Sequence, residues 1–230
     1  MTDASAAATL PPAIEAVMRE QALAVGYAPA ATRAGFAALL DLDHQLASIL
    51  QSTTEPMIGQ MRLTWWYEAL EKLDREPAPA HPVLQRLATS VLPAGVRGAD
   101  LAPMIEGWEA LLDDGDPLDD ERIARHAEAR GGVLFASVGR LLGGEDWEAL
   151  GIAWAKADLA GHMSDQAVAE RIGAQALREL NAALSPKRTG GKRGLSGLAI
   201  LARESLRHPD RLPGHPIRAA RLAWHGLMGR

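Results

Sequence analysis

The segment MRLTWWYEAL, residues 61–70, decides the fold, because it sets two of the chain's six tryptophans side by side within an apparent helix. Leu63, Trp66 and Leu70 recur at helical spacing and define one apolar face. Trp65 lies about 100° around the helix from Trp66 and extends that face. We therefore expect both indoles in the core, with neighbouring helices covering this segment from two sides.

The composition predicts a single all-α domain over residues 1–230. Hydrophobic residues make up 47% of the chain, enough to bury one substantial core. Aromatic and β-branched residues are scarce, and no segment alternates polar and apolar residues as a strand does. Cysteine is absent, which excludes disulfides, thiolate metal sites and a cysteine nucleophile.

Prolines mark the points where helices are expected to begin, because proline lacks the N–H that a helix interior needs. Between Pro117 and Pro186 there is no proline, so two or three longer helices are expected there, divided near residues 143–144 and 161–164. A flexible loop rich in glycine and positive charge is predicted at 185–194, and it lacks the spacing of a phosphate-binding P-loop. The other predicted helices cover residues 11–25, 29–51, 56–74, 82–91, 101–112, 195–207 and 215–228.

The charge is divided unevenly along the chain. Residues 1–185 carry 14 Lys and Arg against 27 Asp and Glu, whereas residues 186–230 carry 10 against 2. The basic region is suited to an acidic protein partner, an anionic membrane surface or a diphosphate. The alternative is that it neutralises the acidic body of its own fold. No nucleic-acid partner is expected.

The N-terminal segment shows no targeting pattern, and no segment has the length and apolar character of a membrane span. We therefore expect a cytoplasmic protein, with peripheral membrane contact through residues 186–230 as an open alternative.

The tryptophan segment and the amphipathic helix after it resemble a known family. The run MRLTWWYEALEKLD, followed by HPVLQRLA, looks like the signature of the bacterial squalene/phytoene synthase family. The resemblance is closest to the branch related to assembly factors of respiratory complex I. Further segments that resemble the family, in the expected order, are residues 22–42, 107–143, 149–162 and 217–230.

The resemblance implies an isoprenoid-synthase fold, an all-α bundle around a deep apolar cavity. In the active members two prenyl diphosphates bind there and are joined head to head. Two aspartate-rich motifs face each other across the cavity and hold Mg²⁺, because hard cations are needed to ionise an allylic diphosphate.

The chain departs from the family where the first aspartate motif is expected, at residues 46–51. Ala47, Ser48 and Gln51 stand where carboxylates are expected. Asp41 and Asp43 lie earlier and are two residues apart, so they diverge by about 200° on a helix and cannot converge on one metal. We expect both on the solvated surface.

The second motif is also altered. Residues 155–166 offer Asp158, His162 and Asp165, whose spacings of four and three suit one helix face. They are the weak candidates for a catalytic or metal site. The alternative is an exposed polar stripe, and imidazole is a poor ligand for Mg²⁺. The basic loop that closes over the diphosphate in active relatives has no counterpart.

Three further groups of residues are expected to be structural. The acids of residues 113–121 suit a turn and the positive N-terminal end of the next helix. Gly131 and Gly132, which follow His126, favour close helix packing or a kink. Surface positions are expected for the histidines at residues 44, 81, 208, 215 and 225.

The departures favour a catalytically degenerate family member, a pseudoenzyme that acts as a non-enzymatic binding or assembly factor without a cofactor. Its partner would be a protein or a prenyl lipid. Trp65 and Trp66 are then core residues, and Arg62 is structural. The alternative is a residual prenyltransferase or prenyl-diphosphate binder, with Mg²⁺ at the reduced site and Arg62 on the diphosphate. A third hypothesis discards the resemblance and leaves a helical interaction module with a basic C-terminal region.

Overall fold

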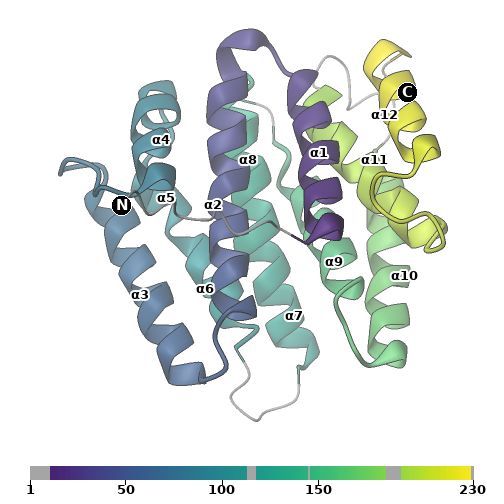
Figure 1. Ribbon diagram of the computed structural model, residues 1–230, viewed down its shortest axis with the longest axis horizontal. Coiled ribbons are helices and arrows are strands. Elements are labelled where there is room, and N and C mark those ends of the chain that lie inside the picture. Colours follow the sequence, from purple (N-terminus) through teal and green to yellow (C-terminus); the bar gives the residue numbers. More distant parts are fainter. Residues whose placement is uncertain (1–10, 113–117, 145, 185–192, 229–230) are drawn as a thin grey trace, which may run out of the picture.

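The computed structural model describes residues 11–112, 118–144, 146–184 and 193–228 (Figure 1). Within these ranges every regular element is a helix, which confirms the all-α class. None of the described helices is both long and apolar enough to cross a membrane.

The first four long elements begin at or near prolines, as predicted. Proline is favoured in the first helical turn because its missing N–H would have no partner there. Pro12, Pro56 and Pro82 occupy this position. The helices are α1 (Pro12–Gly26), α2 (Arg33–Gln51, after a 3₁₀ turn at Ala30–Thr32), α3 (Pro56–Lys72) and α4 (Pro82–Ser90).

The predicted helix at 101–112 is wrong as a single element. The structure has two short helices there, α5 (Gly98–Leu101) and α6 (Pro103–Glu109), with a 3₁₀ turn at Leu92–Ala94 before them. Pro103 lies at the start of α6 and cannot donate a backbone hydrogen bond to the preceding turn, so α5 ends before it.

The long stretch without proline forms the centre of the bundle. Its helices are α7 (Asp120–His126), a π-helical turn (Ala127–Gly132), α8 (Val133–Leu141), α9 (Glu148–Ala160) and α10 (Gln166–Ala183). The predicted divisions are confirmed: Gly143 and Gly144 both adopt positive φ, where glycine is favoured, and α9 ends at Ala160.

Two helices complete the chain, α11 (Arg193–Arg207) and α12 (Pro216–Met228). Residues 185–192 of the predicted loop at 185–194 lie outside the described residues. Its last two residues, Arg193 and Gly194, belong to α11, so this helix begins two residues earlier than predicted.

The prediction that neighbouring helices cover the tryptophan helix from two sides and bury both indoles is wrong. Figure 1 places α3 at one edge of the bundle and α12 at the other, with α2 and α8 between them. An edge helix is covered on one side only, so its neighbouring indoles cannot both be buried. Trp66 is 4% exposed and belongs to the core, whereas Trp65 is 47% exposed.

Close packing at the π-helical turn confirms the expected role of the paired glycines. A Cβ atom on Gly131 would overlap the carbonyl oxygen of Gly151 on α9 and lie 2.6 Å from the Cβ of Ala155. The absence of side chains lets α9 approach the turn that carries Arg130.

Candidate functional site

A cavity of about 480 Å³ lies in the bundle, between the first helices and the central ones. Its volume is within the usual range for small-molecule sites. Apolar side chains form much of the wall, from α1 (Ile14, Val17, Met18), α2 (Ala47, Leu50), α4 (Val83), the end of α6 and beyond (Trp108, Leu111) and α9 (Leu159). Polar side chains from α1, α2, α4, α7, the π-helical turn, α9 and the turn after α9 complete it.

Arg130 joins α2 and α9, the two helices where the resemblance led us to expect aspartate motifs. Its Nε and Nη2 donate to the two carboxylate oxygens of Asp43 on α2, at 2.8 and 2.9 Å. Its Nη1 donates to Asp158 Oδ2 on α9 at 2.6 Å. The guanidinium also lies over the rings of Trp108 and Trp154, 4.4 and 4.7 Å from their centroids. Arg130 thus bonds to carboxylates on opposite walls while its flat faces contact aromatic rings.

The ion pairs fix the charge states of this cluster. Burial lowers the pKa of Arg130, but Asp43 and Asp158 outweigh burial and raise it above its ordinary value. Burial raises the pKa of Asp158, but the charge of Arg130, followed by that of His162, brings it below its ordinary value. Arg130 is therefore a permanent cation, and Asp158 is ionised at neutral pH.

His126 is a fully buried neutral neighbour of this cluster. Burial, and then the charge of Arg130, lower the pKa of His126 to about 4. Its Nδ1 lies 2.7 Å from the carbonyl oxygen of Gly107 and its Nε2 lies 3.4 Å from Arg130 Nη1. We assign the proton to Nδ1, since only that tautomer lets His126 donate to Gly107 and accept from Arg130.

The expectation of a solvated surface for Asp41 and Asp43 is wrong for Asp43. Asp43 is 1% exposed, and its carboxylate is paired with Arg130. Asp41 is partly exposed and pairs with Arg86 of α4 at 3.0 Å. The two aspartates do diverge as predicted. Each one meets an arginine from another helix, which their spacing alone does not indicate.

The three candidates for the second motif do not form one site. Asp158 and His162 line the cavity, and His162 Nδ1 lies 2.8 Å from the backbone oxygen of Asp158. Asp165 is not on the same helix face, because α9 ends at Ala160. Its side chain instead caps α10, where it accepts from the backbone N–H groups of Ala167 and Val168.

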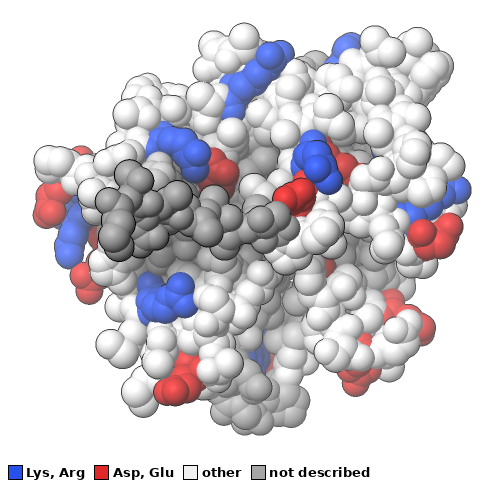
Figure 2. Space-filling model, viewed as in Figure 1, with Lys and Arg blue, Asp and Glu red and all other residues white. Residues whose placement is uncertain are grey.

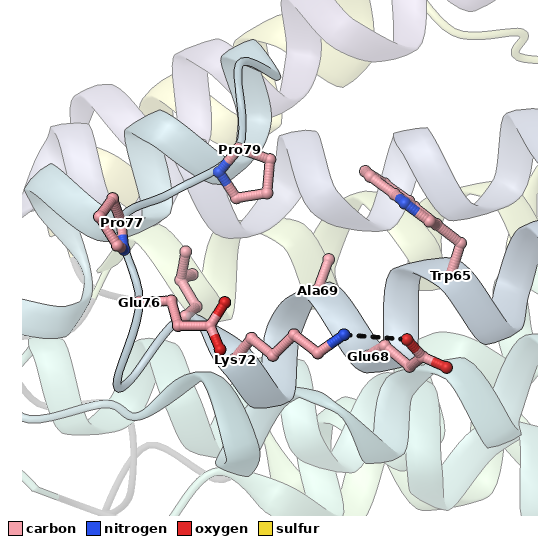
Figure 3. Close-up of a pocket in the computed structure, with 8 residues that line it drawn as sticks. Trp65, Glu68, Ala69, Lys72, Glu76, Pro77 and Pro79 are labelled. Atoms are coloured by element: carbon pink, nitrogen blue, oxygen red, sulfur yellow. Dashed lines mark hydrogen bonds and ion pairs between the residues drawn. The ribbon is translucent and has the colours of Figure 1, made fainter.

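Arg62 and Trp65 lie outside the cavity. Arg62 donates to the hydroxyl groups of Ser52 and Thr53, at 3.0 and 2.8 Å, and so ties the start of α3 to the end of α2. Trp65 packs edge-on against Trp66 and lines a separate pocket of about 150 Å³. Figure 3 shows its ring facing Pro79, with the Lys72–Glu68 ion pair along one side.

The expected surface positions of the histidines are wrong for two of them. His225 is 2% exposed and its Nε2 lies 2.7 Å from Ser196 Oγ, inside the α11–α12 contact. His44 lines the cavity, and its Nδ1 is buried. His81 is partly buried and caps α4. Of the acids at residues 113–121, predicted to form a turn and a helix start, Asp119 confirms the helix start because it caps α7. Residues 113–117 lie outside the described residues.

The donor groups at the cavity do not fit a Mg²⁺ ion. Asp41 is paired with Arg86, and Asp43 and Asp158 are both bonded to Arg130. Mg²⁺ needs several free oxygen ligands in near-octahedral geometry. In the part of the chain that the structure describes, no group of three or more His, Asp or Glu side chains is arranged to hold a metal.

An all-α bundle with a ligand-sized cavity between its helices is the architecture of the isoprenoid-synthase class. A comparison with protein families matches residues 14–180 to squalene/phytoene synthase. This match covers most of the chain, and the chain belongs to the squalene/phytoene synthase family. Searches among curated proteins and among solved structures find no match to it.

Proposed function

We propose that this protein is a non-enzymatic member of its family that binds an uncharged, largely apolar ligand in the central cavity. The observation that carries the proposal is Arg130. Its guanidinium bonds to the carboxylates of Asp43 and Asp158, and those two side chains stand on the walls that would have to grip metal and diphosphate. A cation that belongs to the chain therefore engages the oxygens that a metal would need.

The charge of the cavity supports an uncharged ligand. Three aspartates and two arginines line it, so its ionised side chains carry no excess of positive charge. Both arginines are already paired, Arg86 with Asp41 and Arg130 with two aspartates. A diphosphate would therefore enter beside carboxylates without a free counter-charge, at a high electrostatic cost.

Three polar atoms next to the cavity favour a ligand with a small hydrogen-bonding head. Gln21 Oε1, His44 Nδ1 and Trp108 Nε1 are buried and have no hydrogen-bond partner in the structure, and all three residues line the cavity. Buried polar atoms normally find partners, because leaving one without a partner costs about 1–3 kcal/mol. A hydroxyl or carbonyl group on an otherwise apolar ligand supplies such partners.

The test compares ligands and a cavity-filling variant. Calorimetry with an uncharged prenyl alcohol should show binding, whereas the matching diphosphate with Mg²⁺ should bind more weakly and yield no product. Ser48→Trp, on the cavity wall, should abolish binding of the alcohol. Thr64→Trp on the exposed side of α3 is the matched control, since both hydroxyls bond only within their own helices. Equal binding by the two variants would contradict the proposal.

The resemblance to the complex I assembly-factor branch makes assembly of a protein complex the proposed cellular role. The expected result is that a strain lacking the protein holds less assembled complex I in its membranes, and that wild-type protein restores it.

A second candidate is a residual prenyl-diphosphate binder or prenyltransferase. The observation that favours it is the presence of Arg86, Arg130 and His162 around one cavity. If the two arginines left their aspartate partners, all three side chains would face a bound diphosphate. Mg²⁺ belongs to this alternative only. Turnover of farnesyl or geranylgeranyl diphosphate that disappears in Asp158→Ala would establish it and exclude the non-enzymatic function. The third hypothesis, an unrelated helical module, loses its premise because the chain belongs to the family.

A further inference from the structure

The C-terminal helix α12 exposes an apolar face. Ile217, Trp224, Leu227 and Met228 are between 42% and 72% exposed. At about 100° per residue these positions fall on one side of the helix. Figure 2 shows that the surface over α12, at the upper right, is mostly free of charged side chains. Single exposed apolar residues are ordinary, but four on one helix face, including a tryptophan, form a patch that needs a partner.

The opposite face of α12 is fixed to the bundle, so the apolar face cannot turn inward. Arg218 is 3% exposed and forms a bidentate pair with Glu20 of α1, with Nε and Nη2 at 2.9 and 2.7 Å from its oxygens. Gly226 packs directly against the ring of Tyr27. These contacts hold the orientation of α12 and keep Trp224 outside.

Arginines flank this face. Arg203 and Arg207 lie one turn apart on α11, on either side of Glu204, and Arg221 of α12 pairs with Glu204 at 2.9 Å. Burial, followed by the charges of Arg207 and Arg221, lowers the pKa of Arg203. Glu204 also binds Arg211, and Arg207 donates to the neutral side chain of Asn181.

The acids near this face do not balance it. Among residues 193–228 the sequence has six arginines against Glu204 and Asp210, and one of the six, Arg218, is neutralised by Glu20 of α1. Glu204 is 2% exposed and already shared between arginines, and Asp210 is in the loop between α11 and α12. The apolar face of α12 is therefore surrounded by positively charged side chains.

We propose that α12 binds the surface of an anionic membrane. A helix held parallel to the surface can insert an apolar face to the level of the lipid headgroups, where tryptophan is enriched. Arginine binds lipid phosphate well, because its planar guanidinium donates two parallel hydrogen bonds. The same surround would repel a basic protein partner. This inference is independent of the ligand in the cavity.

A second exposed apolar patch supplies a matched control. Met57 and Met61 on α3 are 76% and 68% exposed. The nearby charges there are of both signs, with Arg62 next to Met61 and Glu68 paired to Lys72, so this patch lacks the predominantly positive surround of α12. Figure 1 shows α3 at the edge of the bundle opposite α12.

The experiment measures sedimentation of the full chain with vesicles of phosphatidylglycerol and phosphatidylcholine, against phosphatidylcholine alone. Wild-type protein should sediment with the anionic vesicles and not with the neutral ones. Trp224→Ser with Leu227→Ser should abolish sedimentation, whereas Met57→Ser with Met61→Ser should leave it unchanged. Arg203→Gln with Arg207→Gln should lower the partition coefficient roughly 25-fold, about fivefold for each charge. Circular dichroism confirms that each variant is folded.

A second measurement locates the contact. Brominated lipid should quench tryptophan fluorescence of the wild type, and Trp224→Phe should keep vesicle binding while losing most of the quenching. The proposal is overturned if the wild type does not sediment with anionic vesicles, or if the α3 variant loses binding as much as the α12 variant. Dimerisation in analytical ultracentrifugation that Trp224→Ser with Leu227→Ser abolishes would instead assign the face to a second copy of the chain and overturn it too.

Discussion

Replacing Arg130 by methionine tests the central cluster directly. Methionine keeps much of the aliphatic volume but removes the charge and every hydrogen bond to Asp43 and Asp158. Asp43 is 1% exposed, so its carboxylate would remain buried without a partner. Removing one member of a buried ion pair costs about 3–5 kcal/mol in free energy of unfolding. Asp158 adds less, because its side chain is 34% exposed and water can replace part of the interaction.

The pH dependence of this loss distinguishes charge from packing. In the wild type Arg130 holds the pKa of Asp158 below its ordinary value against the effect of burial, so that carboxylate stabilises the fold above the pKa of the unfolded chain. Without Arg130 the largest effect that opposes burial is gone, and the pKa of Asp158 should rise. The penalty is then complete at high pH and shrinks as the pH falls through the raised value.

Urea unfolding at about pH 8 and about pH 5 measures both effects. We expect Arg130→Met to lose about 3–5 kcal/mol at the higher pH and less at the lower one. Adding Asp43→Asn should recover part of the loss. Arg62→Met is the control, because among the described residues Arg62 bonds only to two hydroxyl groups near the surface. Its cost should stay below about 1 kcal/mol. A loss from Arg130→Met that equals the control, or that does not change with pH, would refute the reasoning.

The remaining predictions concern packing and protonation. His126 is buried with a pKa of about 4, so as the pH falls the unfolded chain binds a proton at this residue before the folded chain does. The free energy of unfolding should therefore decrease by roughly 3 kcal/mol from about pH 6.5 to pH 4, and this decrease should be smaller in His126→Phe. Gly131→Ala should lower the free energy of unfolding by about 1–3 kcal/mol or more. Gly26→Ala is the control, because no atom lies within 4 Å of the added carbon, and it should change the free energy of unfolding by less than about 0.5 kcal/mol. Equal effects of the two variants would contradict the packing at the π-helical turn. Trp66→Ala should cost about 3–5 kcal/mol by thermal or urea unfolding and Trp65→Ala much less, and the reverse order would show that α3 is oriented differently.

Much of the fold could be predicted because helix starts are local signals. Pro12, Pro56 and Pro82 mark the beginnings of α1, α3 and α4, and Gly143-Gly144 marks the division before α9, since the reason for each lies within one turn of chain. The exposure of Trp65 is different. A helical pattern shows which residues share a face, but not whether one neighbour or two will cover it.

The cluster at the cavity could not be found in this way. Arg130 and Asp43 are 87 residues apart, and neither has a spacing pattern that indicates a site. The spacing of Asp41 and Asp43 correctly predicts that they diverge, but it excludes only a shared metal and does not place either one on the surface. A buried aspartate also requires an arginine or lysine from elsewhere in the chain as a partner. Asking which basic residue could pair with Asp43 if it were buried was the available route to Arg130.

The wide turn at Ala127–Gly132 has a consequence for how such a protein can diverge over evolutionary time. A π-helical turn holds more residues than the α-helical turns beside it. Deleting a single codon there would convert the wide turn into an α-helical one and change the directions in which the side chains of the turn itself point, while the helices on either side keep their orientation. Arg130 would then swing away from one of its aspartates without any change of its own identity. A one-residue insertion or deletion at this turn would therefore be enough to gain or lose the built-in counter-ion, with no point substitution in the cavity wall.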